Sequence, residues 1–144
     1  MTIVSKKKYI IYLIGKPGVG KYTIAKEIAK SGYVICDNQL INNPIFTLLN
    51  YDGFAEVSDK AWHYIDKIRD VVFDFIASET KHNYVLTNVL NEDEEDRQLF
   101  EDVKNIAKKR HAIFVPVKLT ISREEHLKRI QNRDRLKRFK SIDP

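Results

Sequence analysis

The sequence predicts an α/β domain of three layers, in which helices cover both faces of a parallel β-sheet. Short apolar runs alternate with longer segments that have helical spacing, and this alternation is typical of such domains. The first run, Lys8–Ile14, is apolar at nearly every position, as expected of a central strand buried on both faces. Pro116 in the last run lacks a backbone N–H, which favours an edge strand or a bulge. The remaining predicted strands are Tyr33–Cys36, Tyr84–Thr87 and Ala112–Leu119.

The predicted helices are marked by their N-terminal caps. Ser58 is a suitable N-cap for a long helix, and Asn91 with Glu94 and Ser122 with Glu125 have the spacing of a capping box. The predicted helices are Gly20–Lys30, Ile45–Leu49, Asp59–Glu79, Glu92–Lys109 and a segment opened by Ser122. The long helix would bury Ala61, Trp62, Ile65, Ile68, Val72, Phe75 and Ile76.

Length and composition indicate one ordinary globular domain over residues 1–144. The single cysteine, Cys36, excludes an internal disulfide, which suits a reducing cytoplasm, and we expect it to be a small buried residue. No stretch approaches the ~18 consecutive apolar residues that a membrane span requires. We therefore expect a cytoplasmic protein that does not enter a membrane.

The segment between the first strand and the first helix has the pattern of a phosphate-binding loop. Gly15, Gly20 and Lys21 match the spacing G-x-x-x-x-G-K. Glycines let backbone N–H groups approach a polyphosphate, and the following helix directs its positive N-terminus at the anion. Lys21 would then reach the β and γ phosphates. The residues predicted to bind the nucleotide here are Gly15, Pro17, Gly18, Val19, Gly20, Lys21, Tyr22 and Thr23.

The loop departs from its pattern at the position that supplies a magnesium ligand. A Ser or Thr hydroxyl is expected after the lysine, but Tyr22 stands there and a hydroxyl of that kind follows only at Thr23. The phosphate cradle therefore looks complete while the metal ligand is displaced. The remaining candidates for a magnesium site are Thr23 and Asp37.

Two further features lie beyond the loop. Asp37 and Asn88 follow the second and third predicted strands, and ligands bind at the carboxyl ends of parallel strands. Asp37 could hold an acceptor or simply cap the following turn.

The segment Arg123–Lys140 carries eight basic and three acidic residues, which accounts for the whole net charge of +5. Such a segment can close over phosphates, bind nucleic acid or form a solvated face.

On the loop, on Asp37 with the following Leu40-Ile41 and on the arginines after the fourth strand, the chain resembles the small P-loop kinases. This group includes shikimate kinase, gluconate kinase and chloramphenicol phosphotransferase. The resemblance implies a P-loop NTPase fold, ATP with magnesium as donor, Asp37 as the base on the acceptor hydroxyl and residues 38–58 as the acceptor-binding segment. It also implies a phosphate-covering lid, about residues 129–140, that contains Arg129, Arg133 and Arg135, the last two with catalytic roles.

The resemblance also implies a fifth strand and a final helix, whereas this chain stops at Pro144. The sheet edge left open invites a homodimer. We expect a kinase that transfers the γ-phosphate of ATP to a hydroxyl of a small molecule. One alternative is a nucleotide-binding protein without useful catalysis, because of Tyr22 and the short C-terminus. Another is a polynucleotide kinase or RNA-binding module, which ranks last because Phe139 alone interleaves the basic segment.

Overall fold

A parallel four-stranded sheet with the order β2-β3-β1-β4 forms the centre of the structure. The structure is a computed structural model that describes residues 7–130, without the side chains of residues 126, 129 and 130. Its strands are β1 (Tyr9–Ile14), β2 (Tyr33–Cys36), β3 (Asn83–Asn88) and β4 (Ile113–Lys118). Its helices are α1 (Lys21–Ala29), α2 (Asn38–Leu48), α3 (Asp59–Ser78), α4 (Glu94–Lys109) and α5 (Arg123–Ile130).

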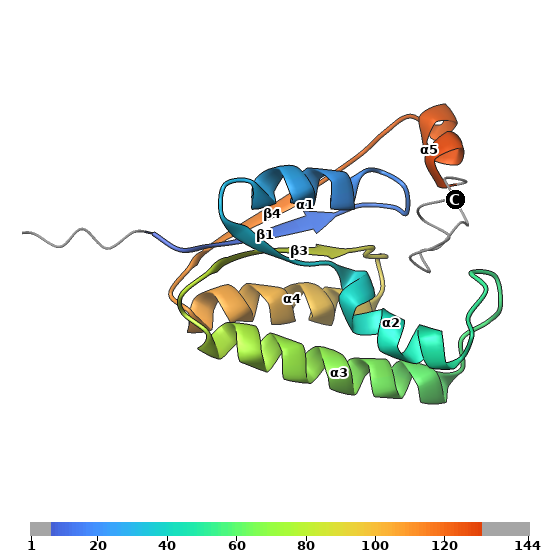
Figure 1. The fold of residues 1–144 in the computed structure, drawn as a ribbon, viewed down its shortest axis with the longest axis horizontal. Helices are drawn as coiled ribbons and strands as arrows, with labels where there is room; N and C mark the ends of the chain where they lie inside the picture. The colour runs from blue at the N-terminus through green and yellow to red at the C-terminus, as the bar shows by residue number, and fades with distance from the viewer. Residues whose placement is uncertain (1–6, 131–144) are drawn as a thin grey trace, which may run out of the picture.

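The helices form two layers around the sheet, which confirms the predicted three-layer α/β fold. Helix α1 covers one face, α3 and α4 cover the other, and α2 and α5 lie toward the carboxyl ends of the strands (Figure 1). Strand β4 is an edge of the four-stranded sheet, as Pro116 predicted, and no strand follows it within residues 7–130. None of the helices described in this range is long and apolar enough to cross a bilayer.

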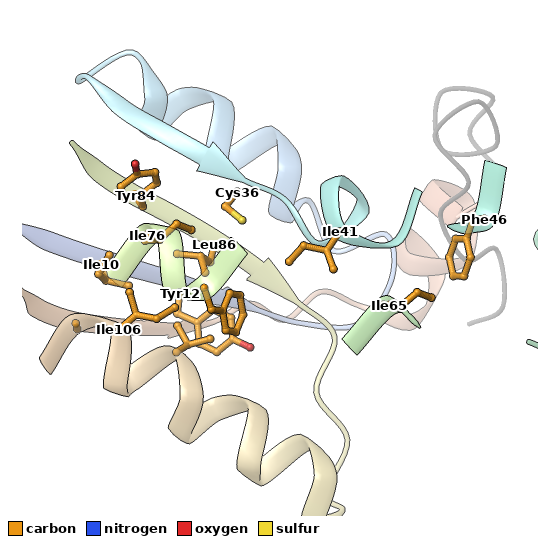
Figure 2. Close-up of a cluster of buried hydrophobic side chains, with 13 residues drawn as sticks. Ile10, Tyr12, Cys36, Ile41, Phe46, Ile65, Ile76, Tyr84, Leu86 and Ile106 are labelled. Carbon is orange, nitrogen blue, oxygen red and sulfur yellow. The ribbon is translucent and has the colours of Figure 1, made fainter. Parts of the chain in front are cut away.

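The larger hydrophobic core lies between the sheet and helices α3 and α4. Tyr12 on β1 and Leu86 on β3 are almost completely buried there, and Ile106 of α4 lies opposite them (Figure 2). Cys36 faces the same core and is 4% exposed, which confirms it as a small buried residue. Burial, with a smaller contribution from the neighbouring Asp37 charge, raises the pKa of its thiol to about 12, so it does not supply a thiolate nucleophile.

Helix α2 begins earlier than the sequence predicted. The expected short helix was Ile45–Leu49, whereas α2 starts at Asn38 and contains Pro44 in its interior. The proline cannot donate to the carbonyl of Leu40, one turn earlier. Both residues are exposed, so water can satisfy that carbonyl and the helix continues through the proline.

Two predictions about helix faces and caps were wrong. Phe75 and Trp62 were expected in the core, but they are 63% and 40% exposed, while Phe73 is buried instead. Three-four spacing locates a helix's apolar face but not which of its marginal residues a neighbouring element covers. Helix α4 begins two residues later than predicted, with Asp93 as its N-cap in place of Asn91. The Asp93 carboxylate accepts from the Asp96 amide at 2.8 Å.

Arg110, the residue just after α4, connects neighbouring elements at the amino ends of the strands. Its guanidinium is almost fully buried and donates to the carbonyl oxygens of Ile76, Glu79 and His82. It also lies over the Tyr84 ring, 4.9 Å from the centroid. Burial by itself raises the pKa of the Glu79 carboxyl. Hydrogen bonds from Tyr84 and from the Lys81 and His82 amides outweigh burial and bring the pKa down to about 2. The arginine thereby joins the end of α3 to the start of β3.

We predict that Arg110→Met lowers the free energy of unfolding by about 2–4 kcal/mol, because it leaves buried carbonyls without a charged donor. Chemical denaturation measures this loss. Lys109→Met is the matched control. Lys109 is the exposed last residue of α4, directly before Arg110, and its substitution should change the free energy of unfolding by less than about 0.5 kcal/mol. Equal effects of the two substitutions would contradict the role assigned to Arg110.

Candidate functional site

The predicted phosphate loop connects β1 to α1, and its first residue is tightly enclosed. The Gly15 amide donates to the Asn88 carbonyl at the end of β3, at 3.3 Å. A Cβ atom at Gly15 would lie 2.6 Å from the Val19 side chain and 3.0 Å from the Leu119 carbonyl oxygen. Position 15 therefore requires glycine for steric reasons, apart from any ligand.

The other two loop glycines give the chain its turn into the helix. Gly18 has a φ of 83° and Gly20 a φ of 102°, which are left-handed values that side chains disfavour. Gly20 is the N-cap of α1 and its carbonyl accepts from the Ile24 amide at 3.0 Å. The N-terminus of a helix carries a partial positive charge and backbone N–H groups that favour an anion, and this end of α1 opens from the glycine loop. The backbone thus has the form of a phosphate cradle.

Lys21 is held inside this loop and is 9% exposed. Its ammonium donates to the carbonyl oxygens of Gly15, at 2.6 Å, and of Lys16, at 3.0 Å. A buried ammonium is costly unless hydrogen-bonded, and these two carbonyls supply the compensation. Phosphate oxygens can take over the same bonds, because an ammonium carries three donors on a flexible stem.

The residues after Lys21 bear on the predicted metal site. The Tyr22 ring lies beneath the Lys26 ammonium, 5.1 Å from ring centroid to nitrogen, and Thr23 is exposed. Within residues 7–130 no cluster of three histidine, cysteine or acidic side chains could hold a metal. Magnesium takes oxygen ligands and keeps several waters. The loop fits a polyphosphate, but its own side chains do not form a complete magnesium site.

Asp37 stands where the sequence placed it, directly after β2, and it is 6% exposed. One of its carboxylate oxygens lies 2.6 Å from the Thr87 hydroxyl, which donates to it. The Asn38 amide donates to the same hydroxyl at 3.1 Å. Because β1 and β2 are both parallel to β3, Asp37 and the phosphate loop lie at the same end of the sheet, where the strands have their carboxyl ends.

Asn88 is the last residue of β3 rather than the residue after it, and it belongs to a hydrogen-bonded network. The Tyr12 hydroxyl donates to the Asn88 side-chain oxygen at 2.7 Å, and Asn88 donates to the Asn38 side chain at 2.9 Å. Burial raises the pKa of the Tyr12 hydroxyl, which therefore stays a neutral donor. The ring lies against the core with its hydroxyl directed toward the carboxyl ends of the strands (Figure 2).

Sequence reasoning missed Thr87 and Tyr12 as members of this site. The available signal was a polar side chain within a strand that is otherwise apolar. At a fully buried strand position, a hydroxyl needs a hydrogen-bond partner.

The first turns of α2 contribute three side-chain oxygens that are buried without a protein hydrogen-bond partner among the described residues. They belong to Gln39, Asn42 and Asn43, and Asn42 is only 5% exposed. Buried polar groups are normally satisfied, so an unsatisfied cluster calls for water or a ligand. The cluster lies within residues 38–58, the segment expected to bind an acceptor.

The predicted lid lies outside what the structure describes. Arg133 and Arg135 fall beyond residue 130, and the Arg129 side chain is among those not described. The start of α5 does confirm one expectation, since the Ser122 hydroxyl accepts from the Glu125 amide at 3.3 Å. The three lid arginines remain a prediction.

Comparison with known proteins supports the identification of the loop. The model of the AAA domain family matches residues 11–141, which include the loop, both strand-end residues and α5. No curated protein matches the chain by sequence.

Solved structures show the same fold at low sequence identity. A candidate kinase from Chloroflexus aurantiacus superposes with a TM-score of 0.63 at 14% identity, covering 94% of this chain and 76% of its own. A chain of a Pnkp1/Rnl/Hen1 complex gives 0.55 at 12% identity, covering 92% of this chain and 42% of its own. Shikimate kinase from Acinetobacter baumannii, solved with shikimate, gives 0.50 at 18% identity, covering 90% and 71%. The chain belongs to the AAA domain family and has the fold of the P-loop small-molecule kinases.

Proposed function

We propose that this protein is a P-loop kinase that transfers the γ-phosphate of ATP to a hydroxyl group of a small molecule. The observation that carries the proposal is that two buried charged residues, Lys21 and Asp37, both lie at the carboxyl ends of the strands. Lys21 is bound inside the glycine loop that follows β1, and Asp37 follows β2, on the other side of β3. Phosphoryl transfer depends on positioning and charge neutralisation more than on covalent chemistry by the protein.

The proposed residues divide the reaction between them. The loop amides and Lys21 hold the β and γ phosphates, and Asp37 accepts a hydrogen bond from the acceptor hydroxyl. The hydroxyl oxygen forms a bond to the γ-phosphorus while the bond from that phosphorus to the bridging oxygen breaks. The hydroxyl proton passes to Asp37 and ADP leaves. Magnesium, when bound, would neutralise phosphate charge, with Thr23 as its candidate ligand.

The unsatisfied oxygens of α2 support a hydroxylated acceptor. The carboxamide oxygens of Gln39, Asn42 and Asn43 accept hydrogen bonds, and hydroxyl groups donate them. A molecule with several hydroxyls could satisfy these atoms and present one more to Asp37. The identity of the acceptor lies in this segment, since fold alone does not specify a substrate.

Tyr22 favours a second candidate, a nucleotide-binding protein without effective transfer. The expected metal hydroxyl is replaced by an aromatic ring that lies against Lys26. Calorimetric titration with a nonhydrolysable ATP analogue, set beside a turnover assay, separates the two candidates. Tight binding without turnover favours the second.

We predict that Lys21→Ala abolishes transfer from γ-labelled ATP, lowering the rate more than about 100-fold, because a preorganised positive charge is lost. The rate is measured with a panel of acceptors: shikimate, gluconate, a nucleoside, a 5′-hydroxyl oligonucleotide, and water alone. The variant should still fold, with its free energy of unfolding lowered by about 1–2 kcal/mol. Lys30→Ala is the control, since that ammonium is exposed and pairs with Glu27. Turnover retained by Lys21→Ala would refute the kinase proposal.

We predict that Tyr22→Ser tightens magnesium-dependent binding of the ATP analogue by about 10-fold, or about 1.4 kcal/mol, by restoring an oxygen ligand. Titrations with and without magnesium measure the effect. Tyr22→Phe keeps the ring without a hydroxyl and should leave the magnesium dependence unchanged. If serine has no effect, then Thr23, Asp37 or water already completes the metal shell.

A further inference from the structure

Thr87 occupies a position where a polar side chain needs a reason. It is the penultimate residue of β3, in the middle of the sheet, and it is 2% exposed. The parallel register pairs Cys36 with Leu86, so the next residues along the two strands, Asp37 and Thr87, emerge side by side. Strand pairing alone therefore brings the threonine hydroxyl to the carboxylate.

The two hydrogen bonds of Thr87 fix the direction in which its proton points. The hydroxyl has one proton, and its oxygen accepts from the Asn38 amide at 3.1 Å. The proton is then free for Asp37, whose carboxylate oxygen lies 2.6 Å away. This distance is in the range of charge-assisted O–H···O⁻ bonds, which are stronger than bonds between neutral groups.

This bond restrains the terminal torsion of the Asp37 side chain. The terminal torsion of an aspartate is broad, because it joins a tetrahedral to a planar carbon. Binding and catalytic groups must be held within about 0.5 Å of their productive position by neighbours that are themselves locked. Thr87 is so locked, since its β-branched side chain is stiff and its hydroxyl is held by the Asn38 backbone.

The support extends further into the sheet. Asn38, which anchors the threonine through its backbone, is itself bound through its side chain by Asn88, and Asn88 is bound by Tyr12. The residues come from the ends of β2 and β3, the start of α2 and the interior of β1. A chain of neutral donors thus ends on one carboxylate, which is the arrangement expected around a group that must not move.

We infer that Thr87 is a positioning residue for phosphoryl transfer: its hydroxyl holds the Asp37 carboxylate in the orientation that receives the acceptor's proton. This inference rests on the proposed kinase function. Because Thr87 is only 2% exposed, the inference has it act through Asp37 and not on the phosphate or the acceptor. When the acceptor oxygen bonds to the γ-phosphorus and its proton passes to Asp37, the Thr87 proton stays on the threonine and only orients the receiving oxygen.

The test compares Thr87→Val, which keeps the shape and removes the donor, with Thr87→Ser, which keeps the donor. Both are measured with the most reactive acceptor of the panel above, water included. Thr87→Val should lower kcat about 10- to 100-fold and change KM for ATP less than about 2-fold, because the misplacement affects the transfer step and not nucleotide binding. Thr87→Ser should retain kcat within about 3-fold. Thr80→Val, exposed at the opposite end of the sheet, controls for the substitution itself and should have no effect.

A double-mutant cycle with Asp37→Asn separates positioning from a purely structural role. In that background Thr87→Val should cause no further loss of kcat, because there is no carboxylate left to orient. Thr87→Ala removes the same donor and decides the question if the valine variant does not fold.

Three results would overturn the inference: an unchanged kcat in Thr87→Val, a loss in Thr87→Ser as large as that in Thr87→Val, or full additivity with Asp37→Asn. A wild-type rate no higher than that of Lys21→Ala is a different outcome. It means that the kinase proposal itself fails, and the positioning role fails with it.

Discussion

The backbone at Gly15 is the contact on which the candidate site depends. Its amide donates to the carbonyl of Asn88, the last residue of β3, and a Cβ atom at Gly15 would lie only 3.0 Å from the Leu119 carbonyl oxygen. The loop can pass between these two groups because β1 lies between β3 and β4, in a register that aligns Ile14 with Asn88 and Lys118. A side chain at this point would collide with the Val19 side chain and the Leu119 carbonyl, and Gly15 itself supplies one of the two carbonyls that hold Lys21. The strand order and the loop therefore specify each other.

Buried charges at the two ends of the sheet are compensated by the same chemistry with different consequences. Arg110 and Lys21 both donate to backbone carbonyls. The planar guanidinium donates to three carbonyls, two at the end of α3 and one just before β3, so its role is to hold these two segments together. The ammonium holds two carbonyls of its own loop, and a phosphate can replace them with oxygens that carry charge. The first arrangement gives stability, whereas the second keeps a cation available.

The sequence was sufficient for the layout of the fold and for the position of Lys21 in the loop between β1 and α1, because each rests on a local pattern. Apolar runs, glycine spacing and helix caps are encoded in adjacent residues, and the strand bounds agree with the prediction to within one position. The errors arose where a neighbouring element decides the outcome. Whether Phe75 is buried depends on what covers α3, and whether Pro44 ends a helix depends on solvent reaching one carbonyl.

Thr87 shows the same limit at the site. Its hydroxyl meets Asp37 through the pairing of β2 with β3, two strands separated by more than forty residues of chain. Nothing in the local sequence around either residue specifies that pairing. Residues that touch a ligand tend to lie in recognisable motifs, whereas residues that orient them are found only once the strands are placed.

Charge balance at the site connects the described residues with the basic segment that follows β4. A nucleoside triphosphate carries several negative charges. Against them the loop provides Lys21, the exposed Lys16 and the helix dipole, and Asp37 adds a negative charge of its own. The strand-end residues Thr87 and Asn88 are neutral. In the proposed kinase, further positive charge would come from a metal or from outside the loop, and the chain's whole excess of +5 lies between Arg123 and Lys140. Helix α5 starts this segment at the end of the sheet where the loop opens (Figure 1). In the proposed kinase, the replacement of the metal hydroxyl by Tyr22 would weaken the metal site and leave more phosphate charge for the basic residues of this segment to neutralise.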